Sequence, residues 1–298
     1  MAKGASNSEA VGPKRAAHDD VLAALAGRGR LRVLSGADGI DFASNDYLAL
    51  AAGAALKQAA LAALERGVPV GAGASRLLRG NHPEHEALES EAATFFGAET
   101  ALFFPTGFAA NQALAATLPR RGDLILHDEW IHASFREGLE GARATVIKTK
   151  HNDAGAVEDA IRAWRGKSGL GRVWIAAETL YSMDGDRAPL EALLAIAARH
   201  DAMLLLDEAH ATGVYGDKGR GLAAPFEGRD NVITLHTCGK AMGAMGALLL
   251  LPRLYRDYLV NRAHGFIYST APSPLMAAIV RAALGVVANA DEIGRAHV

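Results

Sequence analysis

The sequence is poor in cysteine and has no long apolar run. Its one cysteine, Cys238, excludes an internal disulfide and a cysteine-rich metal site, and it fits a reducing compartment. No apolar run reaches the length of a transmembrane helix, and residues 1–20 lack the apolar core of a secretion signal. We therefore expect a cytoplasmic protein with no membrane partner and no bound metal.

The chain also lacks a large excess of positive or negative charge. The formal net charge is −2 over 298 residues, and no block of lysine and arginine occurs. This balance gives no sign of a nucleic-acid partner or of an anionic membrane surface. Half of the residues are hydrophobic, which is enough for a sizeable core in one large domain or two smaller ones.

The most informative stretch runs from Asp207 to Lys240. The apolar run 203–206 stops at Asp207, and the run 231–235 is followed by Thr237 to Lys240. Short continuous apolar runs are typical of buried strands in a parallel sheet. An acid and an amine then lie at the carboxyl edge of the sheet, where ligands bind in open α/β folds. This pair suits pyridoxal 5′-phosphate (PLP), which needs an amine for its aldehyde and an acid for its ring nitrogen.

Simpler explanations exist for both residues. An acid after a strand is often a turn or helix cap, and a lysine in a glycine-rich loop is usually solvated. Residues 207–210 also spell DEAH, as in helicases, but that function requires a G-x-x-x-x-G-K-[ST] loop. The only GK[ST] in the chain is at 166–168, and Ile161 stands where the first glycine must be.

The pattern of the chain predicts an α/β fold with a mostly parallel sheet and one antiparallel strand. Residues 40–50 predict a strand that ends in a turn at 45–46. The predicted strands of the main sheet are 101–104, 123–127, 144–148, 173–178, 203–206, 231–235 and 246–251, the last two antiparallel. The predicted helices are 18–25, 54–66, 84–96, 109–118, 133–141, 156–165, 190–200, 254–262 and 274–288.

Three further polar groups follow strands of this sheet. Thr106, Gly107 and Phe108 join a strand to a helix, and a helix N-terminus with free amides is a ready phosphate site. His132 follows the next strand, and Ser182 lies in the turn after residues 173–178. Turns favour such residues anyway, but their recurrence at successive strand ends predicts a site.

The sequence resembles the α-oxoamine synthases, fold-type I PLP enzymes with a three-layer architecture. The resemblance covers roughly residues 40 to 285 and rests on motifs at 45–48, 73–76, 80–83, 106–111, 132–134, 151–153, 182–186, 207–213, 237–240 and 267–270. Among the members, the biotin-pathway enzyme is the most similar.

The resemblance implies a role for each site residue. Lys240 forms the Schiff base and transfers protons, Asp207 holds the ring nitrogen protonated, and His132 stacks on the ring, with a helix-capping histidine as the alternative. His210 and Ser182 contact the ring hydroxyl. The implied phosphate ligands are Gly107, Phe108 and Thr237, with Ser269 and Thr270 from the partner chain of a homodimer. Thr106, which precedes Gly107, is a further implied cofactor ligand. Asn45 lies near the substrate carboxylate.

The implied reaction is a decarboxylating condensation of L-alanine with a pimeloyl thioester of CoA or a carrier protein. Two alternatives remain open. Sister enzymes use glycine or serine with other acyl thioesters, and the chain could be a cofactor-binding fragment without turnover. Cys238 replaces the serine of many relatives, which we expect to be harmless.

The resemblance also divides the chain. It implies an N-terminal arm at 1–45, a large PLP-binding domain at 46–252, and the beginning of a truncated C-terminal domain at 253–298. The carboxylate-binding arginine of the family has no counterpart. We expect the apolar face of helix 274–288 to pack against the missing domain, and we interpret 292–298 as an assembly artefact.

Overall fold

The computed structural model describes residues 13–34, 36 and 39–290, so residues 292–298 lie outside the described part. The chain divides into two compact units, residues 1–43 and 44–298. In the described part of the first unit, the regular element is helix α1, Pro13–Gly27, which extends the helix predicted at 18–25 at both ends.

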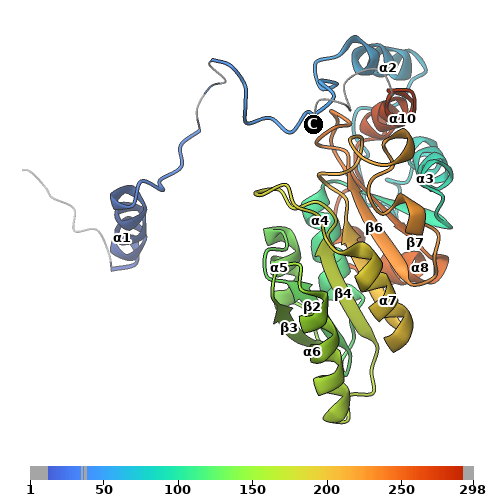
Figure 1. The fold of residues 1–298 in the computed structure, drawn as a ribbon. Helices are drawn as coiled ribbons and strands as arrows, with labels where there is room; N and C mark the ends of the chain where they lie inside the picture. The colour runs from blue at the N-terminus through green and yellow to red at the C-terminus, as the bar shows by residue number, and fades with distance from the viewer. Residues whose placement is uncertain (1–12, 35, 37–38, 291–298) are drawn as a thin grey trace, which may run out of the picture. The chain divides into compact units, whose positions relative to one another are not determined.

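The second unit is built on a seven-stranded sheet with the order β1-β7-β6-β5-β4-β2-β3 (Figure 1). Strand β7 runs antiparallel to both neighbours, β1 and β6, while the other neighbouring strands pair in parallel. The predicted sheet, mostly parallel with one antiparallel strand, is confirmed. The strands are β1 Thr100–Phe104, β2 Leu124–Asp128, β3 Thr145–Thr149, β4 Val173–Glu178, β5 Ala202–Asp207, β6 Val232–Thr237 and β7 Ala247–Leu251.

Helices cover both faces of the sheet, as the apolar strands require. One face packs against α4 (Gly107–Thr117), α5 (Ala133–Glu140), α8 (Arg253–Arg262) and α9 (His264–Ile267). The other face packs against α3 (Pro83–Phe96) and α10 (Pro274–Ala288) at one end, and α6 (Ala154–Gly166) and α7 (Leu190–His200) at the other. Successive residues of β7 alternate between these two cores, with Leu249 and Leu251 on one side and Leu248 and Leu250 on the other. The result is a three-layer fold (Figure 1).

Two expectations are wrong. Residues 40–50 form no strand, because Ile40 and Phe42 are 84% and 93% exposed and find no sheet to cover them. The turn predicted at 45–46 lies two residues later, with 47–48 at its centre, since the amide of Ala49 donates to the carbonyl of Asp46 at 2.8 Å. The apolar face of α10 needs no further domain either: Val280 and Leu284 are buried in a core shared with α3, and α10 also packs against α2, Ala54–Glu65.

The register of the sheet sets where polar side chains emerge. Glu178, the last residue of β4, is paired with Asp207, the last residue of β5, and Asp207 is paired in turn with Leu235 of β6. Strand β1 runs in the same direction as β6, because both are antiparallel to β7. The carboxyl ends of all these strands therefore meet at one edge. None of the helices within the described residues is both long and apolar enough to cross a membrane.

Candidate active site

A pocket opens at this edge of the sheet. Its lining comes from the loops after β1, β2, β5 and β6 and from the end of β4. The lining residues are Gly107, Phe108, Asn111, His132, Ser134, Glu178, Asp207, Ala209, His210, Leu235, Thr237 and Lys240. Seven of them were predicted from the sequence: Gly107, Phe108, His132, Asp207, His210, Thr237 and Lys240. The structure thus brings together side chains that lie up to 133 positions apart in the sequence, from Gly107 to Lys240.

Asp207 is a buried carboxylate that is held on both oxygens. Its Oδ2 accepts a hydrogen bond from Asn111 Nδ2 at 2.6 Å, and its Oδ1 accepts one from the amide of Ala209 at 2.9 Å. The next residue, Glu208, is directed elsewhere, because its carboxylate accepts from the amides of Leu222 and Ala223. Of the two acids in the DEAH stretch, Glu208 therefore binds backbone amides outside the pocket, and only Asp207 lines the pocket.

Lys240 begins a chain of polar contacts that leaves the pocket. Its Nζ contacts Nε2 of His210, whose Nδ1 lies 2.7 Å from the hydroxyl of Tyr47. Burial, and then the Lys240 ammonium, lower the pKa of His210 to about 4. A neutral His210 accepts from Lys240 at Nε2 and donates to Tyr47 at Nδ1. Tyr47 then donates to Oδ1 of Asn45 at 3.1 Å. The predicted substrate ligand Asn45 is thus joined to Lys240 although it does not line the pocket.

Burial lowers the pKa of Lys240 as it lowers the pKa of His210. The negative charges of Asp207 and Glu178 oppose the shift in the pKa of Lys240. Because burial destabilises the charged form, Lys240 is a better nucleophile and base near neutral pH than a solvated lysine.

His132 combines the two functions that the sequence left open. It is the N-cap of α5, where its Nδ1 accepts from the amide of Ser134 at 3.2 Å, and it also lines the pocket. The hydroxyl of Ser134 lies 2.7 Å from the same nitrogen and accepts from Asn111 at 3.0 Å. Partial burial lowers the pKa of His132, while the charge of Asp207 opposes the shift. Asn111 therefore links the positions of Asp207 and His132.

The N-terminus of α4 offers a place for an anion. The Oγ1 atom of Thr106 caps the helix by accepting from the amide of Ala109 at 3.0 Å. The amides of Gly107 and Phe108 precede that bond and have no acceptor among the described residues. Thr237 lies beside them, because a Cβ atom added to Gly107 would be 3.4 Å from its Oγ1. Two free amides, a hydroxyl and a helix dipole together suit a phosphate group.

Sequence reasoning missed the parts played by Glu178, Asn111 and Ser134. Glu178 is 3% exposed, and burial, followed by the charge of Asp207, raises its pKa to about 8. It is therefore neutral at pH 7 and can donate a hydrogen bond inside the pocket. The signal that could have found it is its place at the end of a buried strand in register with Asp207.

Four predicted cofactor ligands do not line this pocket. Thr106 lies just before it as the N-cap of α4. Ser182 is exposed in the loop between β4 and α7. Ser269 and Thr270 follow α9, where the Ser269 hydroxyl donates to the carbonyl of Thr270 at 3.3 Å. Their assignment to a partner's pocket stays a prediction, as does the role of Ser182.

The donor set of the pocket fits PLP. A free amine, a fixed carboxylate, a flat imidazole and an anion-binding helix end are the groups that its aldehyde, ring nitrogen, ring face and phosphate require. Among the described residues, no group of three or more histidine, cysteine, aspartate or glutamate side chains is placed to hold a metal ion.

Comparison with known proteins agrees with this geometry. A curated relative, 8-amino-7-oxononanoate synthase of Geobacter sulfurreducens, is 41% identical over 268 residues, which cover 89% of this chain and 68% of that protein. The structure of the same enzyme from Francisella tularensis is 30% identical with a TM-score of 0.71, covering 85% of this chain and 70% of that one. A structure of SPT with PLP is 26% identical with a TM-score of 0.77, covering 87% and 64%.

The chain spans about two thirds of the length of the curated relatives it matches. Residues 37–296 match the sequence profile of one family, described as aminotransferase class I and II. The profile, the fold-type I architecture and the identity to full-length relatives agree, and the chain therefore belongs to the aminotransferase class I and II family.

Proposed function

We propose that this chain carries the PLP site of an acyltransferase that condenses L-alanine with a pimeloyl thioester. The products are 8-amino-7-oxononanoate, CO₂ and the free thiol of CoA or of a carrier protein, a step of biotin biosynthesis. The observation that carries the proposal is the meeting of Lys240, Asp207 and the N-terminus of α4 in one pocket. The 41% identity to a named 8-amino-7-oxononanoate synthase supports the choice of substrates.

Six of the pocket residues would hold PLP. Lys240 would bond to its aldehyde, Asp207 would accept from its protonated ring nitrogen, and His132 would lie on the ring. The amides of Gly107 and Phe108, with Thr237, would hold the phosphate. When bound, PLP supplies an electron sink that stabilises negative charge at the α-carbon of the amino acid.

The chain's own residues then control protons and charge. Lys240 would be the base that removes the α-proton of alanine, and burial lowers its pKa, which increases the uncharged fraction available for that task. His210 accepts a hydrogen bond from Lys240 but stays neutral near pH 7, because burial lowers the pKa of His210 to about 4. Asp207, which accepts from Asn111, would also accept from the ring nitrogen and favour its protonated form.

Assembly and location follow the same proposal. Ser269 and Thr270 lie outside the pocket of their own chain, which supports their contribution to the phosphate site of a second subunit in a homodimer. A biosynthetic dimer of this kind would act in the cytoplasm.

The likeness to SPT supports a second candidate, in which serine or glycine and another acyl thioester are the substrates. The pocket residues described above would contact the cofactor rather than the acyl chain, so both candidates would use them in the same way.

Borohydride trapping tests the core of the proposal. Protein incubated with PLP, reduced and digested should carry the cofactor on the peptide that contains Lys240. Lys240→Ala should abolish labelling and lower turnover by several orders of magnitude, whereas Lys148→Ala, an exposed lysine on β3, should change neither. Label on another lysine, or unchanged activity of Lys240→Ala, would overturn the assignment.

Thiol release then identifies the substrates. L-alanine, glycine and L-serine are each assayed with pimeloyl-CoA, acetyl-CoA and palmitoyl-CoA, and pimeloyl-CoA is compared with the pimeloyl carrier protein. The proposal expects the highest kcat/KM for L-alanine with a pimeloyl thioester. A preference for serine with palmitoyl-CoA would establish the second candidate.

A further inference from the structure

His151 joins three loops at the edge of the sheet, outside the pocket described above. It lies two residues beyond the end of β3. Its Nδ1 is 2.9 Å from Oδ1 of Asp128, the last residue of β2, and its Nε2 is 2.6 Å from Oδ2 of Asp186, in the loop between β4 and α7. One imidazole thus bridges a carboxylate at the end of β2 and a carboxylate in the loop that follows the neighbouring strand β4.

The ring is also fixed by two aromatic neighbours. Trp130 stacks on it with the ring centroids 3.9 Å apart and the planes at 20°, and Tyr181 meets it edge-on at 4.5 Å. The side chain is 14% exposed. Trp130 belongs to the loop after β2 and Tyr181 to the loop after β4, so the aromatic contacts join the same loops as the carboxylates.

The surroundings favour an imidazolium. Burial lowers the pKa of His151, but the hydrogen bonds with Asp128 and Asp186 and the charges of these carboxylates outweigh it and raise the pKa overall. The loop after β2 contributes a further acid, because Glu129 accepts from the amide of His151 at 3.0 Å. Both ring nitrogens face carboxylates, and only a protonated histidine donates from both.

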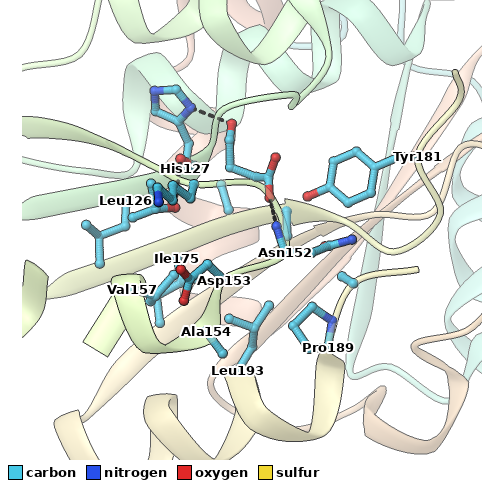
Figure 2. Close-up of a pocket in the computed structure, with 16 residues that line it drawn as sticks. Leu126, His127, Asn152, Asp153, Ala154, Val157, Ile175, Tyr181, Pro189 and Leu193 are labelled. Atoms are coloured by element: carbon cyan, nitrogen blue, oxygen red, sulfur yellow. Dashed lines mark hydrogen bonds between the residues drawn. The ribbon is translucent and has the colours of Figure 1, made fainter. Parts of the chain in front are cut away.

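A pocket lies beside the cluster, and its lining also includes the charged residues Asp128, Lys150 and Asp153 (Figure 2). Its walls include the apolar side chains of Leu126, Val157, Ile175 and Leu193, with Asn152 and Tyr181 also in its lining. The buried Oδ1 atoms of Asn152 and Asp186 have no hydrogen-bond donor among the described residues. Electron-rich oxygens beside apolar walls favour a cation next to them, because the field is poorly screened there.

The two joined loops carry side chains predicted to contact the cofactor, and the loop after β2 reaches the cofactor pocket itself. His132 lies two residues after Trp130 and lines that pocket, while Ser182 directly follows Tyr181. A shift of either loop therefore moves a side chain predicted to contact the cofactor ring.

We propose that His151 is a positioning residue whose imidazolium, held between Asp128 and Asp186, sets the places of His132 and Ser182 against the cofactor. The proposal rests on the proposed function for its catalytic consequence, whereas the bridge itself can be measured in the protein without cofactor. Deprotonation removes one of the two ring donors, so one carboxylate loses its bond to the imidazole. Asp128 keeps the amides of Trp130 and Asn152, and Asp186 keeps Asn152 Nδ2, so the link between the loops weakens but does not vanish.

The fluorescence of Trp130 measures the bridge directly, since a protonated imidazole stacked on an indole quenches it. In cofactor-free protein, fluorescence should rise with a midpoint above pH 6.5, the ordinary value for histidine. Asp186→Asn should lower that midpoint, and His151→Gln and Trp130→Phe should each remove the transition. His200→Gln, which breaks another histidine–carboxylate pair, at Glu158, should leave it unchanged.

The loaded protein tests the positioning itself. His151→Gln should weaken the visible circular dichroism of bound PLP and lower kcat roughly tenfold or more, because a misplacement of about 1 Å can cost about 10²-fold. Asp186→Asn should do the same at a pH where His200→Gln matches the wild type, with far-ultraviolet circular dichroism showing that each variant folds. A Trp130 midpoint at or below 6.5, or a wild-type dichroism and kcat in both variants, would overturn the proposal. Failure of PLP to bind at Lys240 would overturn the proposed function while leaving the fluorescence result standing.

Discussion

Glu178 and Asp207 occupy paired positions at the ends of β4 and β5, and both carboxyl groups line one pocket. Two acids so close together cannot both ionise at low cost. Asp207 has the donors Asn111 and Ala209, which favour its charge, whereas burial keeps Glu178 protonated with a pKa of about 8. Glu178 is therefore the member of the pair that is mostly protonated at pH 7.

The raised pKa of Glu178 predicts a pH-dependent stability. Between its unfolded pKa of about 4.5 and its folded pKa of about 8, the folded state binds more protons, so the free energy of unfolding falls as the pH rises. The slope from this group is at most about 1.4 kcal/mol per pH unit. Urea unfolding of cofactor-free protein from pH 5 to pH 9 should show that Glu178→Gln becomes progressively more stable than the wild type. A pH-independent difference between the two would contradict the assignment.

Asp207→Asn should separate cofactor binding from catalysis. The amide keeps the shape of the carboxylate but cannot hold the ring nitrogen protonated. We expect the exchange of the α-proton of L-alanine with solvent deuterium, followed by NMR, to slow by roughly 10²–10³-fold. The Kd for PLP, measured by absorbance, should change only a few-fold. An equal loss of both, or of neither, counts against the role.

Asn111→Asp should weaken the negative charge on Asp207 without changing Asp207 itself. The new carboxylate would stand where Asn111 Nδ2 now donates to Asp207 at 2.6 Å, so the two acids would share a proton. We expect the exchange rate of L-alanine to fall nearly as far as in Asp207→Asn. Because both changes act on one charge, the double variant should be no slower than the slower single variant, and additive losses would contradict the linkage.

Gly138→Ala should loosen the packing of α4 on α5. A Cβ atom at Gly138 would lie 2.8 Å from Cβ of Ala115 and 2.9 Å from the backbone of Gln112, so one helix must move. We expect a loss of about 1–3 kcal/mol in the free energy of unfolding. Gly285→Ala on α10 is the matched control: it meets nothing within 4 Å and should add about 0.5–1 kcal/mol through helix propensity. Equal effects at both sites would show that helix propensity alone decides.

The strands of the second unit could be predicted because they are continuous apolar runs. The helices could be predicted because their apolar residues recur at the longer period of a helix. The strand expected at 40–50 failed because the apolar character of Ile40 and Phe42 does not show whether a sheet is there to bury them. The prediction that α10 packs against a missing domain was wrong for a related reason. An apolar face predicts that a helix is buried but not which elements bury it. The pairing of β1 with β7 escaped prediction because nearly 150 residues separate the strands.

The site residues also divide into those that the local sequence predicts and those that only the three-dimensional contacts reveal. Lys240 and Asp207 could be found because a charged residue directly after a buried strand must emerge at the sheet edge. Asn111 and Ser134 lie in helices, where a polar residue is unremarkable until its contacts across α4 and α5 are known. Glu178 counted as the end of a strand, and its neutral state depends on burial that no local pattern reveals.

The connection between β6 and β7 is short and closed by its own hydrogen bonds. The amide of Cys238 donates to Gly246 at 2.8 Å, and that of Gly243 donates to Lys240 at 2.8 Å. Gly246, at φ 128°, leaves no space for a side chain against the ring of Phe103. The backbone beneath the reactive amine is therefore ordered before any ligand arrives. Its conformational entropy is lost during folding, so cofactor binding need not supply that cost again.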